Sequence, residues 1–351
     1  MSFKLPCYLL FIGCVSILLS ACVKTEVDPE NVDITKYNEG VLIANFGSQQ
    51  NGVGSFTYYD RQTEKVIGDV YRDQNDGRSI GGTIQSFTRF QDRGYAVVGD
   101  RVEVIDLLTF KSIKSITGFE MPRYFLPITS SKAYVSDWGD GFSGSVKVID
   151  LDEGKIVETI ETNTKGPERM VRRGNKVYLA NSGGFLADDR VTILDVSSDV
   201  VKQHITVGVD PIELQIDDKG QIWVLAKGFI DSNNPENSKM GRLSKISNDQ
   251  VTLNVELSNV VSSLTINKAK DVLYFVMDGW VREFPITATS LGTAPLIDRF
   301  FLRIDIDPET DQLYGSDPRN YNNNGEIFIY NMAGEEVGSF SAGVVPGAFV
   351  F

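Results

Sequence analysis

The feature that most constrains the fold of this chain is an internal repeat with a period of about 45 residues. An aspartate that ends an apolar segment recurs every 44 to 46 residues, at Asp60, Asp106, Asp150 and Asp195. A proline that opens another apolar segment follows the same period, at Pro122, Pro167 and Pro211. A constant period of this length is typical of arrays in which one supersecondary unit is repeated.

Each repeat contains four short segments rich in Val, Ile, Tyr and Phe, the residues that favour β-strands. A clear copy includes residues 176–181 and 190–195. Four strands in about 40–45 residues are typical of one propeller blade. The stretch from Gly40 to Phe351 has room for seven such units. We therefore predict an all-β fold, a seven-bladed β-propeller.

The two ends of the repeat region predict how the ring closes. The first unit begins at residues 41–44 with a segment that matches the second strand of the other units, so its first strand is missing locally. The last residues, 345–351, contain a proline and match the missing strand. We expect this C-terminal strand to join the first blade, which would hide both sheet edges.

The first 21 residues have the pattern of a signal peptide. Lys4 precedes an apolar run from Tyr8 to Leu19, which is shorter than the roughly 20 residues that cross a bilayer. The run ends in Leu-Leu-Ser-Ala directly before Cys22. Small residues before a cysteine resemble the bacterial lipoprotein processing box, in which the cysteine carries the lipid. The alternative is an ordinary signal peptide in which Cys22 has no role.

These boundaries predict three parts. Residues 1–21 are the lipoprotein signal peptide, residues 22–37 are the lipidated cysteine and a flexible polar tether, and residues 38–351 are the propeller. All cysteines lie in the first two parts, so the propeller holds no thiol for a disulfide, a metal site or a nucleophile. We expect a lipid anchor at Cys22 to hold the protein in the outer membrane, facing the cell exterior.

The charge of the chain bears on its partners. It has 47 Asp and Glu residues against 34 Lys and Arg residues, and its net charge is −13. Such an acidic protein repels phosphate groups, so we expect neither nucleic acid nor an anionic lipid surface as a partner.

The repeat that includes residues 176–181, residues 191–195 and Pro211 resembles the YVTN-type propeller repeat family, the YncE-like proteins. The opening residues 38–45 and the closing residues 343–351 resemble a narrower group, the surface lipoprotein propellers of gut-type Gram-negative bacteria. Some members of that group capture cobalamin outside the cell and pass it to the outer-membrane transporter for vitamin B12. The resemblance covers about residues 38–351, and no short motif in it marks the cobalamin-binding residues.

The resemblance implies a cell-surface protein that binds a ligand without catalysis and without a cofactor. We expect it to capture a nutrient for a TonB-dependent outer-membrane transporter, with cobalamin as the lead candidate for the small-molecule ligand. Two alternatives stay open. The protein is an adhesin or scaffold that binds a glycan or a protein, or it is a glycan hydrolase or lyase that uses paired carboxylates.

The long loops indicate where a ligand binds. In an up-and-down blade, the loop between strands two and three emerges on the same side as the connection to the next blade, and most insertions fall there. These loops are residues 46–53, 137–143, 181–189, 227–239 and 316–324. Aromatic rings beside polar groups suit ligand contact, although the rings can instead pack beneath their own loops. The predicted ligand-binding residues are Phe46, Gln49, Arg123, Trp138, Asp140, Phe142, Phe185, Asp188, Phe229, Arg319, Tyr321 and Asn322.

Arg123 has a different origin from the loop residues. Arg123, Glu168 and Arg169 begin predicted first strands, which line the central channel of a propeller. There they either bind a polar ligand or form a solvated wall.

The sequence lacks the residues that most kinds of catalysis and metal binding require. The single histidine, His204, falls on a predicted outer strand with no partner for catalysis or metal binding. We therefore predict neither a catalytic residue nor a metal site. A Ca²⁺ ion held by Asp137, Asp140, Asp317 and Asn322 is the alternative.

Overall fold

The computed structural model describes residues 1–2, 37, 39–48, 50, 52–258 and 261–351. The chain divides into two units, residues 1–34 and residues 35–351, and the second unit is described here. Cys22 and most of the predicted signal peptide and tether lie outside the described residues, as does Gln49. In the described part of the chain, no helix has both the length and the apolar character needed to span a bilayer.

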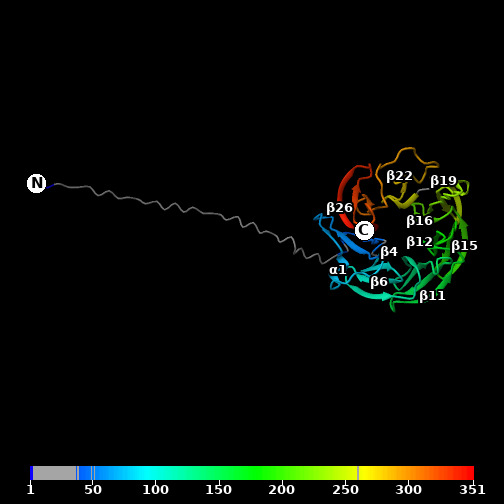
Figure 1. Cartoon of the computed structure of the whole chain (residues 1–351), viewed down its shortest axis with the longest axis horizontal. Helices are drawn as coiled ribbons and strands as arrows, with labels where there is room; N and C mark the ends of the chain where they lie inside the picture. Colours follow the sequence, from blue (N-terminus) through cyan, green and yellow to red (C-terminus); the bar gives the residue numbers. More distant parts are fainter. Residues whose placement is uncertain (3–36, 38, 49, 51, 259–260) are drawn as a thin grey trace. The chain divides into compact units, whose positions relative to one another are not determined.

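Seven small antiparallel sheets form a ring around a central channel (Figure 1), which confirms the predicted seven-bladed propeller. Blade 1 contains β27 (Pro346–Val350), β1 (Val41–Asn45), β2 (Ser55–Tyr59) and β3 (Val66–Ile67). Blade 2 contains β4 (Ile84–Phe90), β5 (Arg93–Val98), β6 (Arg101–Asp106) and β7 (Ser112–Ile116). Blade 3 contains β8 (Pro122–Pro127), β9 (Lys132–Asp137), β10 (Ser145–Asp150) and β11 (Lys155–Glu161).

The remaining blades continue in chain order, each from the innermost strand outward. Blade 4 contains β12 (Pro167–Arg173), β13 (Lys176–Asn181), β14 (Arg190–Asp195) and β15 (Val200–Thr206). Blade 5 contains β16 (Pro211–Ile216), β17 (Ile222–Ala226), β18 (Arg242–Ser247) and β19 (Gln250–Glu256), with a short 3₁₀ helix at Pro235–Asn237. Blade 6 contains β20 (Val261–Ile266), β21 (Val272–Met277) and β22 (Trp280–Pro285). Blade 7 contains β23 (Arg303–Ile306), β24 (Leu313–Asp317), β25 (Asn324–Tyr330) and β26 (Glu336–Val344).

The recurring aspartate closes the turn between the third and fourth strands. At Asp195, one carboxylate oxygen accepts hydrogen bonds from the backbone N–H groups of Ser197 and Ser198, at 2.9 and 3.2 Å. Hydrogen bonds from the side chain and the backbone of Ser197 lower the pKa of Asp195 to about 2. The same turn forms at Asp60, Asp106 and Asp150. Each predicted aspartate therefore fixes a turn.

The prolines mark the innermost strands, as predicted. β8, β12 and β16 begin at Pro122, Pro167 and Pro211, and the C-terminal strand β27 begins at Pro346. Proline is tolerated at the first residue of a strand because the hydrogen bond that it cannot donate is dispensable there.

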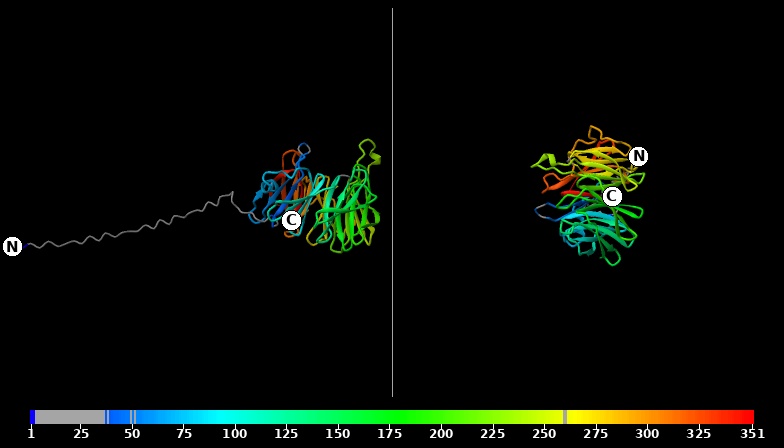
Figure 2. Two further views of the ribbon diagram at one scale, coloured as in Figure 1. Left: turned by 90° about the horizontal axis from the view of Figure 1, so that it is seen from below. Right: turned by 90° about the vertical axis from the view of Figure 1, so that its right-hand side faces the viewer.

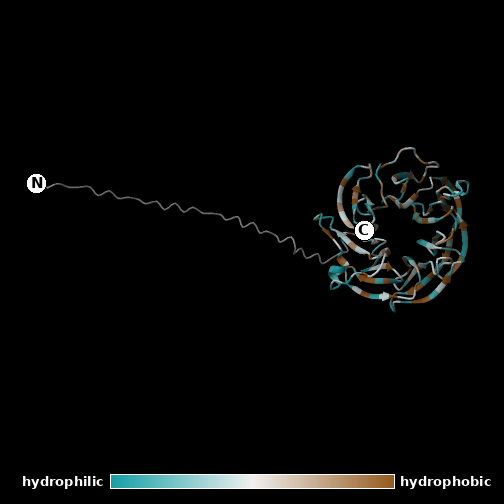
Figure 3. Ribbon diagram, in the orientation of Figure 1, coloured by the Kyte–Doolittle hydropathy of each residue, from teal (hydrophilic) through white to brown (hydrophobic). Residues whose placement is uncertain are grey.

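The core lies between neighbouring blades. Tyr134 and Val146 of blade 3 pack with Val177 and Leu179 of blade 4 in one buried cluster. Each blade is therefore covered on both faces, and its middle strands are apolar along most of their length, as the hydropathy colours show (Figure 3). Polar contacts join blades as well: the hydroxyl of Tyr178 donates to Asp249 of the next blade, at 2.6 Å.

Two elements depart from the expected four-strand repeat. Blade 6 has three strands, and its fourth is replaced by residues 286–302, which pair with β22 only through Val281 and Ile297. Gly292 and Pro295 interrupt this segment, and both residues weaken strands. A five-residue helix, α1 (Val70–Gln74), also lies between β3 and β4, where Asp69 accepts a hydrogen bond from the backbone N–H of Arg72.

The C-terminal strand closes the ring, which confirms the predicted closure. β27 pairs antiparallel to β1, with Phe349 opposite Ile43. The rings of Phe349 and Phe351 lie 5.9 and 5.2 Å from the ring of Tyr314 in blade 7. The last residues of the chain therefore connect blade 1, which they complete, with blade 7.

Deleting residues 347–351 should open the ring, because it removes the innermost strand of blade 1 and exposes the edge of β1. We expect the melting temperature in thermal unfolding to fall steeply. The control is Val337→Thr, which changes an exposed residue on the outer strand β26. A truncated protein that melts like the full chain would contradict this closure.

A buried carboxylate on blade 2 predicts a pH dependence. Glu103 is 4% exposed and accepts hydrogen bonds from Tyr71, Arg101, Ser112 and Ser115. Burial alone would raise its pKa, but these donors outweigh burial and hold the pKa below its ordinary value of 4.5. A carboxylate with a depressed pKa stabilises the fold above its unfolded-state pKa, and this contribution is lost as the pH falls through the folded-state value.

Glu103→Gln should therefore lower the melting temperature at pH 7. The difference from the wild type should shrink as the pH falls below the ordinary carboxyl range and through the lowered pKa of Glu103, because the wild-type carboxylate becomes protonated there. Thermal unfolding between pH 3 and pH 7 measures this, with the exposed Glu158→Gln as the control. A pH-independent difference would show that the ionised state of Glu103 does not matter.

Candidate functional site: the channel mouth and its rim

The five long loops emerge on one side of the disc, which we call the rim. They join the second and third strands of blades 1, 3, 4, 5 and 7, and those after β1 and β17 project furthest on the same side (Figure 2, left). Every exposed aromatic ring among the described residues lies on this side: Phe142, Phe185, Phe229, Trp280, Phe300 and Tyr321. The sequence predicted four of these and missed Trp280 and Phe300, because blade 6 has only a tight turn at the rim.

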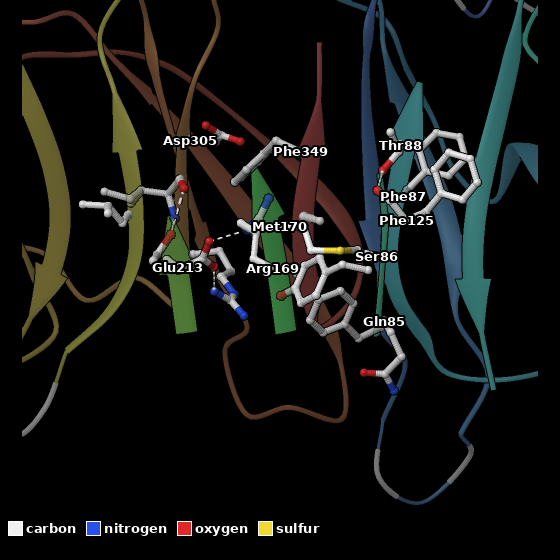
Figure 4. Close-up of a pocket in the computed structure, with 18 of the residues that line it drawn as sticks. Gln85, Ser86, Phe87, Thr88, Phe125, Arg169, Met170, Glu213, Asp305 and Phe349 are labelled. Carbon is white, nitrogen blue, oxygen red and sulfur yellow. Dashed lines mark hydrogen bonds and ion pairs between the residues drawn. The ribbon is translucent and has the colours of Figure 1, made fainter. Parts of the chain in front are cut away.

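The innermost strands enclose a cavity of about 100 Å³ in the channel (Figure 4). Residues from all seven blades line it, and many are polar, including Gln85, Thr88, Gln215 and Asp305. Phe46 also lines this cavity and packs against Gly347 of the C-terminal strand. Phe46 therefore belongs to the channel and not to the exposed part of the rim.

An ion network centred on the buried carboxylate of Glu213 crosses the channel. Glu213 is 2% exposed and accepts a hydrogen bond from Arg303 of blade 7 at 2.8 Å. Its other carboxylate oxygen pairs with Arg169 of blade 4 (Figure 4). The guanidinium of Arg169 lies 4.8 Å from the ring centre of Tyr124 in blade 3. These four residues join blades 3, 4, 5 and 7 at the centre of the disc.

A second cavity, of about 340 Å³, opens at the rim end of the channel, and we call it the mouth cavity. It shares Tyr124, Glu213 and Arg303 with the channel cavity, so the ion network lies between the two. The other residues that line it include Arg123, Trp138, Glu168, Ser182, Leu186, Asp210 and Lys227.

The charged groups of the mouth cavity pair with each other. Arg123 and Glu168 lie 3.3 Å apart, and Lys227 and Asp210 lie 3.4 Å apart. Burial raises the pKa of Glu168, and the charge of Arg123 opposes this. Burial likewise raises the pKa of Asp210, against the effect of Lys227. Arg123, Glu168 and Arg169, the three residues predicted to line the channel, all form ion pairs.

An aromatic cluster borders the mouth cavity. The ring of Phe185 lies 6.1 Å from that of Trp138 and 5.7 Å from that of Phe142, edge to face in both pairs. Phe142 is 54% exposed and Phe185 is 61% exposed. The guanidinium of Arg123 lies 4.4 Å above the ring centre of Trp138, so the cluster connects directly to the ion pairs of the cavity.

Close backbone contact between two loops fixes this cluster. The backbone N–H of Phe185 donates to the carbonyl of Gly141 at 2.9 Å. Gly184 has a φ of +62°, and a Cβ there would lie 2.6 Å from the carbonyl oxygen of Gly141. Only glycine allows such an approach. The exposed rings are therefore held by backbone contacts between blades 3 and 4.

The other predicted residues lie elsewhere or have structural partners. Asp188 is buried and pairs with Arg190 at 2.6 Å, and Asp140 accepts hydrogen bonds from the backbone of Phe142 and Ser143 within its own loop. Phe229 is exposed on the blade 5 loop. Arg319 pairs with Glu326 on blade 7, where Tyr321 and Asn322 are exposed. The structure thus brings Arg123, Trp138, Phe142 and Phe185 together. The residues predicted on the loops of blades 5 and 7 do not belong to this cluster.

The side chains proposed for the alternative Ca²⁺ site form hydrogen bonds with backbone groups. Both carboxylate oxygens of Asp137 accept backbone N–H groups, from Glu120, Met121 and Gly139. Within the described part of the chain, no three His, Cys, Asp or Glu side chains gather as a metal ion would require.

Sequence reasoning missed Glu213, Arg303, Asp210 and Lys227. A signal existed for Glu213, which stands two residues after Pro211 in the first strand of blade 5, as Arg169 stands two residues after Pro167 in blade 4. Arg303 has no such mark, because blade 7 does not open with a proline.

Comparisons with known proteins agree with this fold. Residues 39–339 match the family model described as Domain of unknown function (DUF5074). No curated protein matches the sequence. A quinonprotein alcohol dehydrogenase-like protein from Bacteroides thetaiotaomicron has a similar structure, with a TM-score of 0.67 and 16% identity over 90% of this chain and 78% of its own.

Two further solved structures are similar. Hydrazine synthase from Kuenenia stuttgartiensis has a TM-score of 0.63 and 15% identity, over 84% of this chain and 97% of its own. A candidate 6-phosphogluconolactonase from Bacteroides uniformis has a TM-score of 0.63 and 10% identity, over 89% and 99%. At these identities, the three similarities show the propeller fold alone.

Glu213→Gln tests the ion network. The change removes the carboxylate from between the guanidinium groups of Arg169 and Arg303, which are 40% and 26% exposed, and losing a hydrogen bond to a charged group costs about 1.5–3 kcal/mol. We expect a loss of that size in the free energy of unfolding, measured by chemical denaturation. Glu256→Gln, an exposed change on the outer strand of the same blade, should have no measurable effect. Equal stabilities of the two variants would rule out a stabilising network.

Proposed function

Because the chain belongs to the family described as Domain of unknown function (DUF5074), its family assigns no activity, and we propose from the site that it is a binding protein. In this proposal, the protein is anchored by lipid at Cys22 on the outer face of the outer membrane. It captures a small molecule at the mouth cavity for a TonB-dependent transporter. Cobalamin is the lead candidate for the ligand.

The observation that supports the proposal is the combination of a recessed cavity with an exposed aromatic border. Its volume of about 340 Å³ falls in the range of small-molecule sites. Phe142 and Phe185 present apolar area beside it, and the contacts of Gly141 and Gly184 hold them in place before any ligand arrives. Such preorganisation lowers the entropic cost of binding.

The pairing of the carboxylates favours binding over catalysis. A general acid or base needs a carboxyl group that is free to exchange a proton with the substrate. In the mouth cavity, Glu168 and Asp210 each have a cationic partner, so proton exchange would disrupt an ion pair. We therefore propose that this site performs no chemistry, although proteins of the same fold carry enzyme names.

Cobalamin matches the chemistry of the site. A corrin is a large, mostly apolar ring system with amide arms. It is too large for the mouth cavity, so the ring would lie against Phe142, Phe185 and Leu186 at the border. The amide arms would reach the polar groups of the cavity, such as Arg123 and Ser182.

Isothermal titration of the purified protein with cyanocobalamin tests this proposal. We expect saturable binding, and we expect Phe185→Ala to weaken it at least tenfold, because the change removes most of one exposed ring from the contact. Val157→Ala, which shortens an exposed side chain on the outer strand β11, should bind like the wild type.

Two results would count against the proposal. Absence of heat, together with an unchanged melting temperature at micromolar ligand, would eliminate cobalamin. Binding that Phe185→Ala leaves unchanged would place the ligand elsewhere. Binding of an oligosaccharide in place of cyanocobalamin would support the glycan-binding alternative.

A further inference from the structure

Two arginines share one carboxylate at the floor of the mouth cavity, where it meets the channel cavity. Glu213 accepts a hydrogen bond from Nη1 of Arg303 at 2.8 Å, and its other carboxylate oxygen pairs with Nε of Arg169. Arg303 lines both cavities, and Arg169 lines the channel cavity. One negative charge therefore faces two positive charges at the junction of the two cavities.

Both guanidinium groups have hydrogen-bond donors that the protein does not use. Nη1 and Nη2 of Arg169, and Nε and Nη2 of Arg303, make no hydrogen bond with any described residue. Of the nitrogens of these two groups, only Nε of Arg169 is enclosed by the protein without such a bond. The four unused nitrogens are therefore accessible from the cavities that the two side chains line.

The hydroxyl of Tyr124 is a further unused donor beside them. Tyr124 lines both cavities, and the guanidinium of Arg169 lies 4.8 Å from its ring centre. Its hydroxyl is not enclosed, and it makes no hydrogen bond within the described part of the chain. Burial raises the pKa of Tyr124, so the hydroxyl keeps its proton and can donate it to an acceptor. Side chains of blades 3, 4 and 7 thus offer donors to the same cavity.

The neighbouring charges do not cancel the extra positive charge. The two other ion pairs of the mouth cavity each contain one cation and one anion. Asp305 lines the channel cavity but forms no ion pair with Arg169 or Arg303. Its carboxylate accepts hydrogen bonds from the hydroxyl of Thr265 and the backbone N–H of Ile306, at 2.7 and 2.9 Å. Burial raises the pKa of Asp305, which favours its neutral form.

We propose that Arg169, Arg303 and Tyr124 form an anion-binding subsite, which takes one monoanionic oxyanion group of the ligand, a carboxylate or a phosphodiester. Guanidinium groups suit such groups because their N–H donors form paired hydrogen bonds with two oxygens. A monoanion balances the single extra charge, whereas a dianion would exceed it. The inference rests on the proposed function in taking the mouth cavity as the binding site. It is compatible with the lead candidate, because cobalamin carries one phosphodiester beside its amide arms.

The experiment follows the side-chain Nε–H signals of the arginines in ¹⁵N-labelled protein by NMR, at constant ionic strength. Arg169→Lys and Arg303→Lys assign the two signals. Acetate and dimethyl phosphate are the probes, and acetamide, which has the shape of acetate without its charge, is the control. We expect at least one of the anions to move both signals saturably, and acetamide to move neither. Arg93, which is 39% exposed and lies near Asp92 on blade 2, should not respond.

Two variants should change the affinity for the anion in opposite directions. Tyr124→Phe keeps the ring beside Arg169 but removes the hydroxyl, and we expect the affinity to fall about tenfold, the usual effect of one lost hydrogen bond to a charged group. Asp305→Asn removes a negative charge from the channel cavity and should raise the affinity several-fold. Glu158→Gln makes the same charge change on an exposed outer strand and should leave the affinity unchanged.

The outcomes separate this inference from the proposed function. If an anion moves both arginine signals but cyanocobalamin does not bind, the lead candidate is wrong and the subsite stands. If cyanocobalamin binds but neither anion moves these signals, the proposed function stands and the inference fails. A response to acetamide as large as that to acetate, or an equal response of Arg93, likewise overturns the inference. The titration of the wild type decides between these outcomes even if a variant does not fold.

Discussion

Each sheet of this protein has two apolar faces, and only a neighbouring sheet can cover them. This constraint requires a closed ring, because an open row would leave one apolar face exposed at each end. The buried cluster that joins Tyr134 and Val146 to Val177 and Leu179 shows one such contact between blades. The pairing of β27 with β1 completes the ring, because the last residues of the chain supply the innermost strand of the first blade.

Ring closure also creates the site. It brings seven innermost strands to one axis, where their side chains must either fill the channel or pair across it. Glu213 does the latter by binding Arg169 and Arg303, which are 44 and 90 residues away in the sequence. The mouth cavity lies on the rim side of this network, and the glycine contacts between two loops hold aromatic rings at its border. The rigid centre thus supports a site whose walls are charged yet internally paired.

The repeat made most of the fold predictable, because turns and strand openings depend on local chemistry. An aspartate such as Asp195 hydrogen bonds two and three residues ahead, and a proline such as Pro167 affects its own strand. The site was less predictable, since its geometry depends on which side chains meet across the ring. Trp138, Phe142 and Phe185 were identified as rim residues, but neither their clustering nor the pairing of Glu213 with Arg303 has a signature in the sequence.

The missing outer strand of blade 6 has a consequence for how the molecule comes apart. In the other blades the third strand is paired along both edges, at least in part, whereas the backbone hydrogen bonds of β22 to the segment on its outer side are all made by Val281, with Leu296 and Ile297. Amide protons on that side depend on few hydrogen bonds, and such regions open at a lower free energy than the rest of a domain. We therefore expect local unfolding of the propeller to begin at blade 6. Insertions into residues 286–302 should destabilise the neighbouring blades least.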